Sequence, residues 1–308
     1  MNEGGHLDDL ATFARIADLG SLTRAGRALG MTPSAVSRSL RRLEGRLGTT
    51  LVHRTTRHVA LTEEGARFHR RVQRLLADLE EAEAEARGQG GAITGTLRIS
   101  TFTSLAPHQL LPLLPEFMAR HPALKVDLDL SDRRVDLVAE GIYVGIRLGT
   151  LGDSALIARK IGWTTRLVCA APAYLARRGR PKTPHDLTDH DCLAYRDPGL
   201  THLNAWPFDM PEGRIMVPIS GPIAASDGEA VYKLTVAGLG IARLSRFVAA
   251  AEIRAGRLMP LLQDFEVKDE APLHAVYPDK RHLPPRVSAF VSFLAERFLP
   301  VPPWEKRA

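Results

Sequence analysis

The first thirty residues carry two short stretches in which apolar residues recur at helical spacing. The first stretch runs from about Leu10 to Gly20, with its apolar positions three and four residues apart. The second runs from a capping residue, either Ser21 or Thr23, to Gly30. The pattern predicts two short helices separated by a glycine turn.

A third stretch follows after a single turn residue. It begins with Thr32 as N-cap and Pro33 at the first helical position, and it ends at Gly48. Its apolar face is formed by Val36, Leu40, Leu43 and Leu47. Three short helices with a tight turn between the last two predict a helix-turn-helix. Residues 51–61 predict a two-stranded ribbon, and residues 1–61 together predict a winged helix-turn-helix DNA-binding domain.

Residues 62–87 show a different pattern, the narrow apolar seam of a helix that pairs with another helix. The seam consists of Phe68, Val72, Leu75, Leu79, Ala82 and Ala86. Arginines precede glutamates on the outer face, which suits an antiparallel pair of identical helices. A helix packed on its own domain is the alternative. Because Gly88–Gly91 follows as a hinge, we expect residues 62–91 to form a linker and dimerisation helix ending at a domain boundary.

From residue 92 to residue 308 strands alternate with helices. Strands are predicted at 97–100, 126–130, 144–148, 166–170 and 273–277, and helices at 111–120, 135–140 and 285–298. We interpret this as two α/β lobes: lobe I at about 92–163 and 269–308, and lobe II at about 164–268. The predicted fold class is therefore α/β overall: a mostly α winged helix-turn-helix, a long linker helix and a two-lobed α/β effector domain.

Charge and composition narrow the function. The 308 residues are 44% hydrophobic, enough to bury cores, and carry a net charge of +6. Between Ser21 and Arg57 there are eight arginines against one acid, Glu44, so the positive excess is concentrated where DNA would bind. A solvated, salt-bridged face is the alternative. The two cysteines, Cys169 and Cys192, form no metal or disulfide pattern, and no long apolar run is present. We therefore expect a cytoplasmic protein without a membrane partner.

The third helix carries the chemistry expected of a DNA-reading element. Thr32, Ser34 and Ser37 place hydroxyls at its N-terminal turn, where backbone N–H groups favour phosphates. Arg38 follows one turn later, and we expect it to hydrogen-bond guanine, with Ser34 beside it. Phosphate contacts are assigned to Arg41, Arg42 and Arg46. For any single arginine, an ordinary surface charge is the alternative.

These residues and their spacing resemble the LysR-type family of bacterial transcriptional regulators. The resemblance is carried by Leu10-x-x-Phe13, Gly20–Thr23, Thr32–Arg38, Leu43-Glu44-x-x-Leu47-Gly48 and Leu61-Thr62-x-x-Gly65, and later by Asp136–Gly141, Ile146–Gly149, Ala171–Leu175, Gly238–Ala242 and Pro285–Phe290. It implies DNA contacts from Pro33, Ser34 and Ser37. It also implies that Arg57 of the wing enters the minor groove with Arg54 near the backbone. Two departures are Gly26, where alanine is usual, and Val52, where phenylalanine is usual.

The resemblance also implies a small-molecule effector, an organic anion, held in a cleft between lobes like those of periplasmic binding proteins. Ser100, Thr101, Phe102 and Thr103 match the family position, at a strand end that precedes a helix. Arg147 is the expected counter-charge. Ser226 opens a later helix as part of an N-cap or of the cleft lining, and Thr201 and Leu203 are weaker candidates. Double-stranded DNA with an interrupted palindromic operator, a homodimer through residues 62–87, a homotetramer and RNA polymerase are the expected macromolecular partners.

Other classes fit the sequence less well. The chain lacks the GxSxG, HExxH and GxxxxGK[ST] motifs, so we expect no catalytic residues, no metal and no cofactor. A hydrolase triad assembled from distant residues stays open as an alternative. A periplasmic binding protein would share the two lobes but would need an export signal. A DNA-coating protein without sequence preference would not need the long lobed region.

Overall fold

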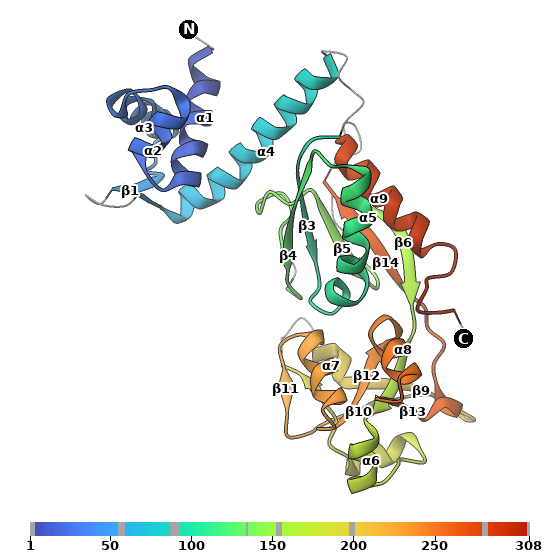
Figure 1. The fold of residues 1–308 in the computed structure, drawn as a ribbon. Coiled ribbons are helices and arrows are strands. Elements are labelled where there is room, and N and C mark those ends of the chain that lie inside the picture. Colours follow the sequence, from blue (N-terminus) through green and yellow to red (C-terminus); the bar gives the residue numbers. More distant parts are fainter. Residues whose placement is uncertain are drawn as a thin grey trace. The chain divides into compact units, whose positions relative to one another are not determined.

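The computed structural model describes residues 4–54, 59–86, 93–133, 135–151, 156–196, 201–278 and 283–306 (Figure 1). They form two compact units, Met1–Thr96 with Asp136–Tyr143, and Leu97–Val135 with Val144–Ala308. The first unit is mainly helical and holds one small ribbon, whereas the second contains the larger sheets. The predicted fold class is confirmed.

The first unit contains the predicted helix-turn-helix and ribbon. Its elements are α1 (Gly4–Leu19), α2 (Leu22–Leu29), α3 (Pro33–Leu47), the antiparallel strands β1 (Val52–Arg54) and β2 (Val59–Leu61), and α4 (Glu63–Ala86). Ser21, rather than Thr23, caps α2, and Thr32 caps α3 by accepting the Ala35 N–H at 3.2 Å. Gly30 and Gly48 end α2 and α3 with φ of 64° and 65°, in the left-handed region that glycine adopts without strain.

The apolar faces of the first three helices meet in one core that also takes in the start of α4. Phe13, Val36 and Leu40 are fully buried in this core. Phe68, Val72 and Leu76 of α4 pack against it, and the Phe13 and Phe68 rings lie 5.6 Å apart. Phe68 and Val72 therefore face their own domain. For these two residues the structure agrees with the alternative interpretation, a helix packed on its own domain.

The rest of the predicted seam lies differently. Leu75 is 49% exposed, although it is a large apolar residue in the middle of α4. Leu79 is half-buried, and the side chains of Ala82 and Ala86 lie outside the described residues. The hinge at 88–91 is likewise outside them. The apolar pattern of α4 thus combines an inward-facing row with an outward-facing leucine.

Two glycines of the helices α2 and α4 sit where a side chain would meet backbone. A Cβ on Gly65 of α4 would lie 1.9 Å from the Leu51 carbonyl oxygen, so only glycine fits there. A Cβ on Gly26 would lie 2.7 Å from the Met31 carbonyl oxygen. The departure from the family's alanine at position 26 therefore matches the close approach of the α2–α3 turn in this chain.

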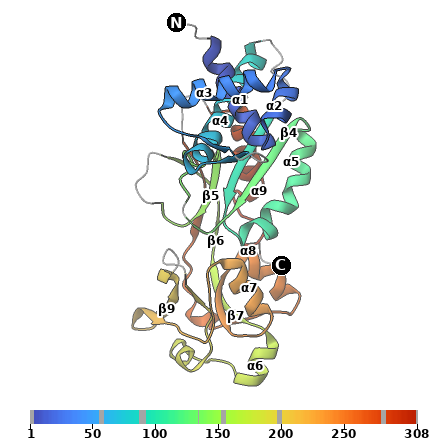
Figure 2. The ribbon, with the colours of Figure 1, turned by 90° about the vertical axis from the view of Figure 1, so that its left-hand side faces the viewer.

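Lobe I of the second unit is built on a five-stranded sheet in the order β4-β3-β5-β14-β6 (Figures 1 and 2). Its strands are β3 (Gly95–Thr101), β4 (Leu124–Leu130), β5 (Val144–Leu148), β6 (Ile157–Thr164) and β14 (Ala271–Tyr277). Its helices α5 (Leu114–Arg120) and α9 (Pro285–Phe298) pack together through Phe117, Phe290 and Phe293, with ring centroids 5.2 and 5.3 Å apart. The chain leaves this lobe after β6 and returns at β14.

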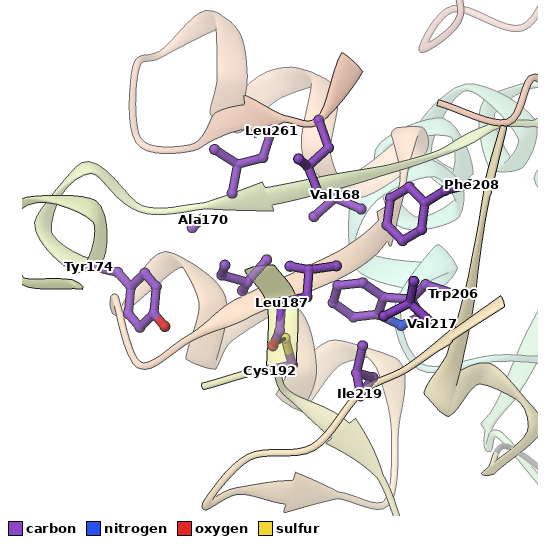
Figure 3. Close-up of a cluster of buried hydrophobic side chains, with 12 residues drawn as sticks. Val168, Ala170, Tyr174, Leu187, Cys192, Trp206, Phe208, Val217, Ile219 and Leu261 are labelled. Atoms are coloured by element: carbon purple, nitrogen blue, oxygen red, sulfur yellow. Dashed lines mark hydrogen bonds between the residues drawn. The ribbon is translucent and has the colours of Figure 1, made fainter. Parts of the chain in front are cut away.

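Lobe II holds a second, smaller sheet in the order β12-β7-β13. Its elements are β7 (Arg166–Ala170), α6 (Pro172–Arg178), β8 (Ala194–Tyr195), the hairpin β9 (Ala205–Met210) and β10 (Gly213–Pro218), β11 (Ala224–Ala225), α7 (Gly228–Val236), β12 (Ile241–Ser245), α8 (Arg246–Arg254) and β13 (Met259–Leu261). Figure 3 shows its core, in which Trp206 and Phe208 of the hairpin pack near Val168 of β7. The buried face of the sheet is thus covered by the hairpin.

Two sequence predictions for lobe I need correction, and one strand has no counterpart among the predictions. Residues 135–140 form one capped turn rather than an α-helix: the Asp136 carboxylate accepts the N–H groups of Val138 and Ala139, both at 3.0 Å, and the turn ends at Gly141, whose φ is 67°. The predicted helix 111–120 begins earlier, as a π-turn from Ala106 and a 3-10 turn, and it is α-helical only from Leu114. Strand β6 was not predicted, since an edge strand exposes charged residues that interrupt its alternation.

Candidate DNA-binding and effector sites

The N-terminal turn of α3 presents the predicted hydroxyls to the outside. Thr32 and Ser34 are exposed, and their hydroxyl oxygens lie 3.0 Å apart. Pro33 and Arg38 are exposed as well, and Arg41 donates to the Ser37 hydroxyl at 3.4 Å. Hydroxyls, N-terminal backbone N–H groups and a long guanidinium therefore share one end of a helix, as major-groove recognition requires. The DNA role of each residue stays a prediction.

Two of the predicted phosphate contacts have a partner inside the protein. Asp9 of α1, whose side chain is 2% exposed, accepts from Ser39 Oγ at 2.5 Å and from Arg42 Nη2 at 2.7 Å. Arg46 Nη1 lies 3.5 Å from the other carboxylate oxygen. Burial by itself would raise the pKa of Asp9, but hydrogen bonds from Arg42 and Ser39 and the nearby arginine charges outweigh it and hold that pKa below its usual value.

Asp9 therefore fixes α3 through contacts on the side of the helix that faces α1. Arg42 and Arg46 contact this buried carboxylate, but their side chains are 60% and 40% exposed, so they stay accessible together with Arg38 and Arg41. The sequence contained a signal for Asp9, since Asp9, Phe13 and Ile16 follow helical spacing on the buried face of α1. An acid at a core position needs a partner, and α3 supplies one.

Glu44, the single acid within the basic segment, also has a structural task. Its Oε1 accepts the backbone N–H groups of Leu51 and Val52 at 2.9 and 3.3 Å. These bonds hold the first strand of the wing against the end of α3. The side chain of Arg54 and all of Arg57 lie outside the described residues, so their predicted DNA contacts remain predictions.

The predicted effector residues of lobe I lie at the end of β3. Ser100 and Thr101 are fully buried, and the Thr101 hydroxyl has no hydrogen-bond partner in the described part of the chain. Arg147 donates to the Ser100 carbonyl at 3.2 Å, to the Ser100 hydroxyl at 3.1 Å and to the Ile146 carbonyl at 2.9 Å. Burial lowers the pKa of Arg147, and the charge of Asp129 opposes that shift. The guanidinium proposed as a counter-charge is thus already bonded to lobe I itself.

Asp132, which the sequence did not single out, joins the two lobes. Its carboxylate accepts from the Thr103 N–H at 2.7 Å and from the Thr103 hydroxyl at 2.9 Å. The same carboxylate accepts from the Gly228 N–H at 2.7 Å, at the first turn of α7 in lobe II. A side chain of the protein therefore occupies the anion position at this helix N-terminus.

Further contacts connect the lobes around Asp132. Asp227 caps α7 by accepting the Ala230 N–H at 2.8 Å, as the N-cap interpretation of this segment required. Phe102, one of the predicted effector residues, packs against Phe247 of α8 with ring centroids 5.7 Å apart. His108 lies 3.0 Å from Glu229. The predicted residues Phe102 and Thr103 thus lie where the lobes meet.

The remaining candidates are more peripheral. Thr201 and Leu203 belong to a 3-10 turn, Thr201–Asn204, in which Thr201 is exposed. Ser226 is exposed just before the cap of α7. Their role toward an effector stays a prediction. Within the described ranges no three His, Cys, Asp or Glu side chains gather as a metal site, and no helix there has the length and apolar character to span a membrane.

Two family models match the chain. The one described as "Bacterial regulatory helix-turn-helix protein, lysR family" covers residues 7–66, and "LysR substrate binding domain" covers residues 90–299. The HTH-type transcriptional regulator CrgA of Neisseria meningitidis serogroup C is 36% identical over 289 residues, 94% of this chain and 96% of CrgA. The HTH-type transcriptional activator AaeR of Escherichia coli K12 is 32% identical over 297 residues, 96% of this chain and 94% of AaeR.

Solved structures agree with these matches. The structure of CrgA from Neisseria meningitidis has a TM-score of 0.63 at 36% identity, covering 94% of this chain and 97% of that one. The full-length virulence activator AphB of Vibrio cholerae has a TM-score of 0.60 at 27% identity, covering 95% and 99%. Both similarities extend over the DNA-binding and the lobed regions together.

Proposed function

This chain belongs to the LysR family of DNA-binding transcriptional regulators, and we propose that it binds an interrupted palindromic operator as a homodimer and responds to a small organic acid between its lobes. The observation that carries the DNA role is the N-terminal turn of α3, where Ser34 and Arg38 are exposed on a helix fixed from behind by Asp9. The protein acts by binding rather than by catalysis, and its place is the cytoplasm, where the chromosome and RNA polymerase are.

The assembly proposal rests on α4. Leu75 is 49% exposed in the middle of this helix, while its neighbours Val72 and Leu76 pack inward. An exposed leucine beside an inward row is suited to pairing with a second copy of α4. Two such dimers would form the tetramer. A twofold dimer places two α3 helices on two half-sites, which is why the operator should be palindromic.

The test is fluorescence anisotropy of the purified protein on labelled DNA from its own upstream region, with a shuffled duplex of equal composition beside it. We expect salt-sensitive binding with a preference of about 10³-fold or more for the natural duplex. Equal and weak binding to both duplexes, repeated on DNA selected from random sequence, would contradict the proposal. Sedimentation of the same protein and of Leu75→Glu reports the assembly, and the variant should dissociate to monomers.

A further inference from the structure

We propose that Arg166 of lobe II, with the Tyr195 hydroxyl beside it, receives the acid group of the effector. This inference rests on the proposed function and makes it more specific, because it names the cation that a small organic acid would meet. It also replaces Arg147 in the role that the sequence suggested. The argument begins with what each charged group near the lobe contact already binds.

The two obvious places for an anion are taken. Arg147 makes three hydrogen bonds to Ser100 and Ile146, so it is held within lobe I. The N-terminus of α7 is bonded to Asp132 through the Gly228 N–H at 2.7 Å. An effector carboxylate at α7 would have to displace Asp132, and at Arg147 it would meet a guanidinium whose charge is already shared with backbone and hydroxyl acceptors of lobe I.

Arg166 differs from both. It is the first residue of β7, and its partly buried side chain makes no hydrogen bond or ion pair with any residue in the part of the chain that the structure describes. Burial lowers its pKa, and the neighbouring Tyr195 opposes that shift. Guanidinium groups removed from water are normally paired, because an unpaired buried charge is costly. A binding partner from outside the chain would supply the missing acceptor.

A second arginine increases the local positive charge. In the antiparallel pairing of β12 with β7, Arg243 lies opposite Val168 and Ser245 opposite Arg166, so both arginine side chains leave the same face at diagonal positions. Arg243 likewise has no hydrogen bond or ion pair among the described residues. Burial and the charges of Arg166 and Arg214 lower the pKa of Arg243 to about 10, while the charges of Asp269 and Glu266 oppose this shift. Arg243 thus already faces carboxylates of the protein, whereas Arg166 faces none among the described residues.

Tyr195 places this charge next to the contact between the lobes. A Cβ built on Gly228 would lie 3.7 Å from the Tyr195 hydroxyl and 3.0 Å from the Ser104 hydroxyl of lobe I. The same tyrosine feels the charges of Arg166, Asp132 and Asp227, and burial raises its pKa to about 12, so it stays a neutral donor. On the lobe I side, Thr101 adds a buried hydroxyl without a partner.

This arrangement favours an organic acid over a neutral or cationic ligand. A carboxylate can accept two parallel hydrogen bonds from a guanidinium, and a neutral tyrosine can donate a third. An amide of the same shape would lack the charge that compensates Arg166. A cationic analogue would be repelled by both arginines.

The experiment measures melting temperature and calorimetric affinity of the full-length protein with sodium formate, acetate and benzoate, each beside its amide. At least one carboxylate should stabilise the wild type, and its amide should not. Arg166→Gln should weaken that carboxylate at least 10-fold, whereas Arg166→Lys should weaken it less. Arg120→Gln, which removes an exposed arginine paired with Glu116 and Glu296, is the matched control and should bind like the wild type.

The outcomes distinguish a failure of the proposed effector site from a failure of the proposed DNA-binding function. Formate is too small for shape to exclude it, so a wild type that responds to none of the three carboxylates overturns the proposal. Equal affinity in Arg166→Gln and wild type overturns it as well. Operator binding without effector is measured for every variant, and Arg166→Gln should retain it. Failure of the wild type to prefer its operator would remove the proposed function, while the anion titration would still decide the role of Arg166.

Discussion

Asp9 and Asp132 each accept several hydrogen bonds, and they act in opposite kinds of environment. Asp9 is buried inside the DNA-binding unit, where its partners are the side chains of Ser39 and Arg42. Asp132 is partly exposed, and its partners are a backbone N–H in each of two lobes together with the Thr103 hydroxyl. The first carboxylate has no access to competing solvent, whereas the second can exchange its bonds for water or a ligand at small cost.

The difference assigns rigidity and adjustability to separate regions. The DNA-reading helix needs one orientation, because base contacts tolerate little displacement. The lobes need two arrangements of similar free energy, because an effector can shift only an equilibrium that already exists. A buried side-chain cluster suits the first requirement, and a few exchangeable hydrogen bonds suit the second.

The largest expected effect is a loss of stability on replacing Asp9. Asp9→Asn removes the charge that Arg42 and Arg46 share and should lower the free energy of unfolding of the DNA-binding unit by about 3 kcal/mol, measured by urea denaturation. Asp8→Asn, on the exposed neighbouring position of α1, is the matched control and should change stability by less than about 0.5 kcal/mol. Equal effects of the two variants would contradict a special role for Asp9.

The wild type and Asp9→Asn should also differ in the pH dependence of their stability. Because the folded pKa of Asp9 is lowered, its contribution to stability is complete above the unfolded value of about 3.9 and is lost as the pH falls through the lower folded pKa. The wild type should therefore lose stability in that acidic range more steeply than Asp9→Asn does. Parallel curves for the two proteins would show that Asp9 is not the group that titrates.

An intermediate effect is expected for Arg38. Arg38→Ala should cost about 1–3 kcal/mol of binding free energy on the natural operator and relax the preference at one base position per half-site. Arg41→Ala, on the same exposed helix, should weaken natural and shuffled duplexes alike. Competition anisotropy with operators changed one base pair at a time distinguishes the two patterns. An unchanged base preference in Arg38→Ala would contradict its assignment as the reading residue.

The smallest effect is expected at the lobe contact. Asp132→Asn keeps the size of the side chain but removes the charge-assisted bonds to Thr103 and Gly228, which should cost about 1 kcal/mol. The melting temperature should fall by roughly 2–4 °C, with Asp264→Asn on an exposed turn as the control. A loss of stability as large as that of Asp9→Asn would contradict the view that the Asp9 contacts are fixed and the Asp132 contacts are adjustable.

How far the sequence was informative differs between the two regions for a physical reason. The helices and caps of the DNA-binding unit follow from local rules, so Ser21, Thr32, Gly30 and Gly48 identify them without any tertiary knowledge. Which residue pairs with a given arginine depends on contacts between residues that are far apart in the sequence. Nothing local distinguishes Arg147, which bonds to Ser100, from Arg166, which has no partner among the described residues.

The errors in lobe I have the same origin. Residues 135–140 carry a helical pattern, but Gly141, in the left-handed region, ends the segment after a single turn capped by Asp136. Strand β6 was missed because its pattern depends on its place at the sheet edge, which only the pairing with β14 reveals. The effector candidates at Ser100–Thr103 can be proposed from sequence because a strand end before a helix is visible there, whereas Asp132 and Tyr195 become relevant only through contacts across the lobes.

The contact between Gly65 and the Leu51 carbonyl has a mechanical consequence. Backbone lies against backbone there, and the Thr62 N–H donates to the same carbonyl at 3.0 Å while its hydroxyl donates to Thr50 at 2.9 Å. Side chains of the shared core, among them Val59, Leu61 and Phe68, add to this backbone contact. In a dimer joined through α4, rotation of one α4 helix relative to the other would therefore move the attached ribbon with it.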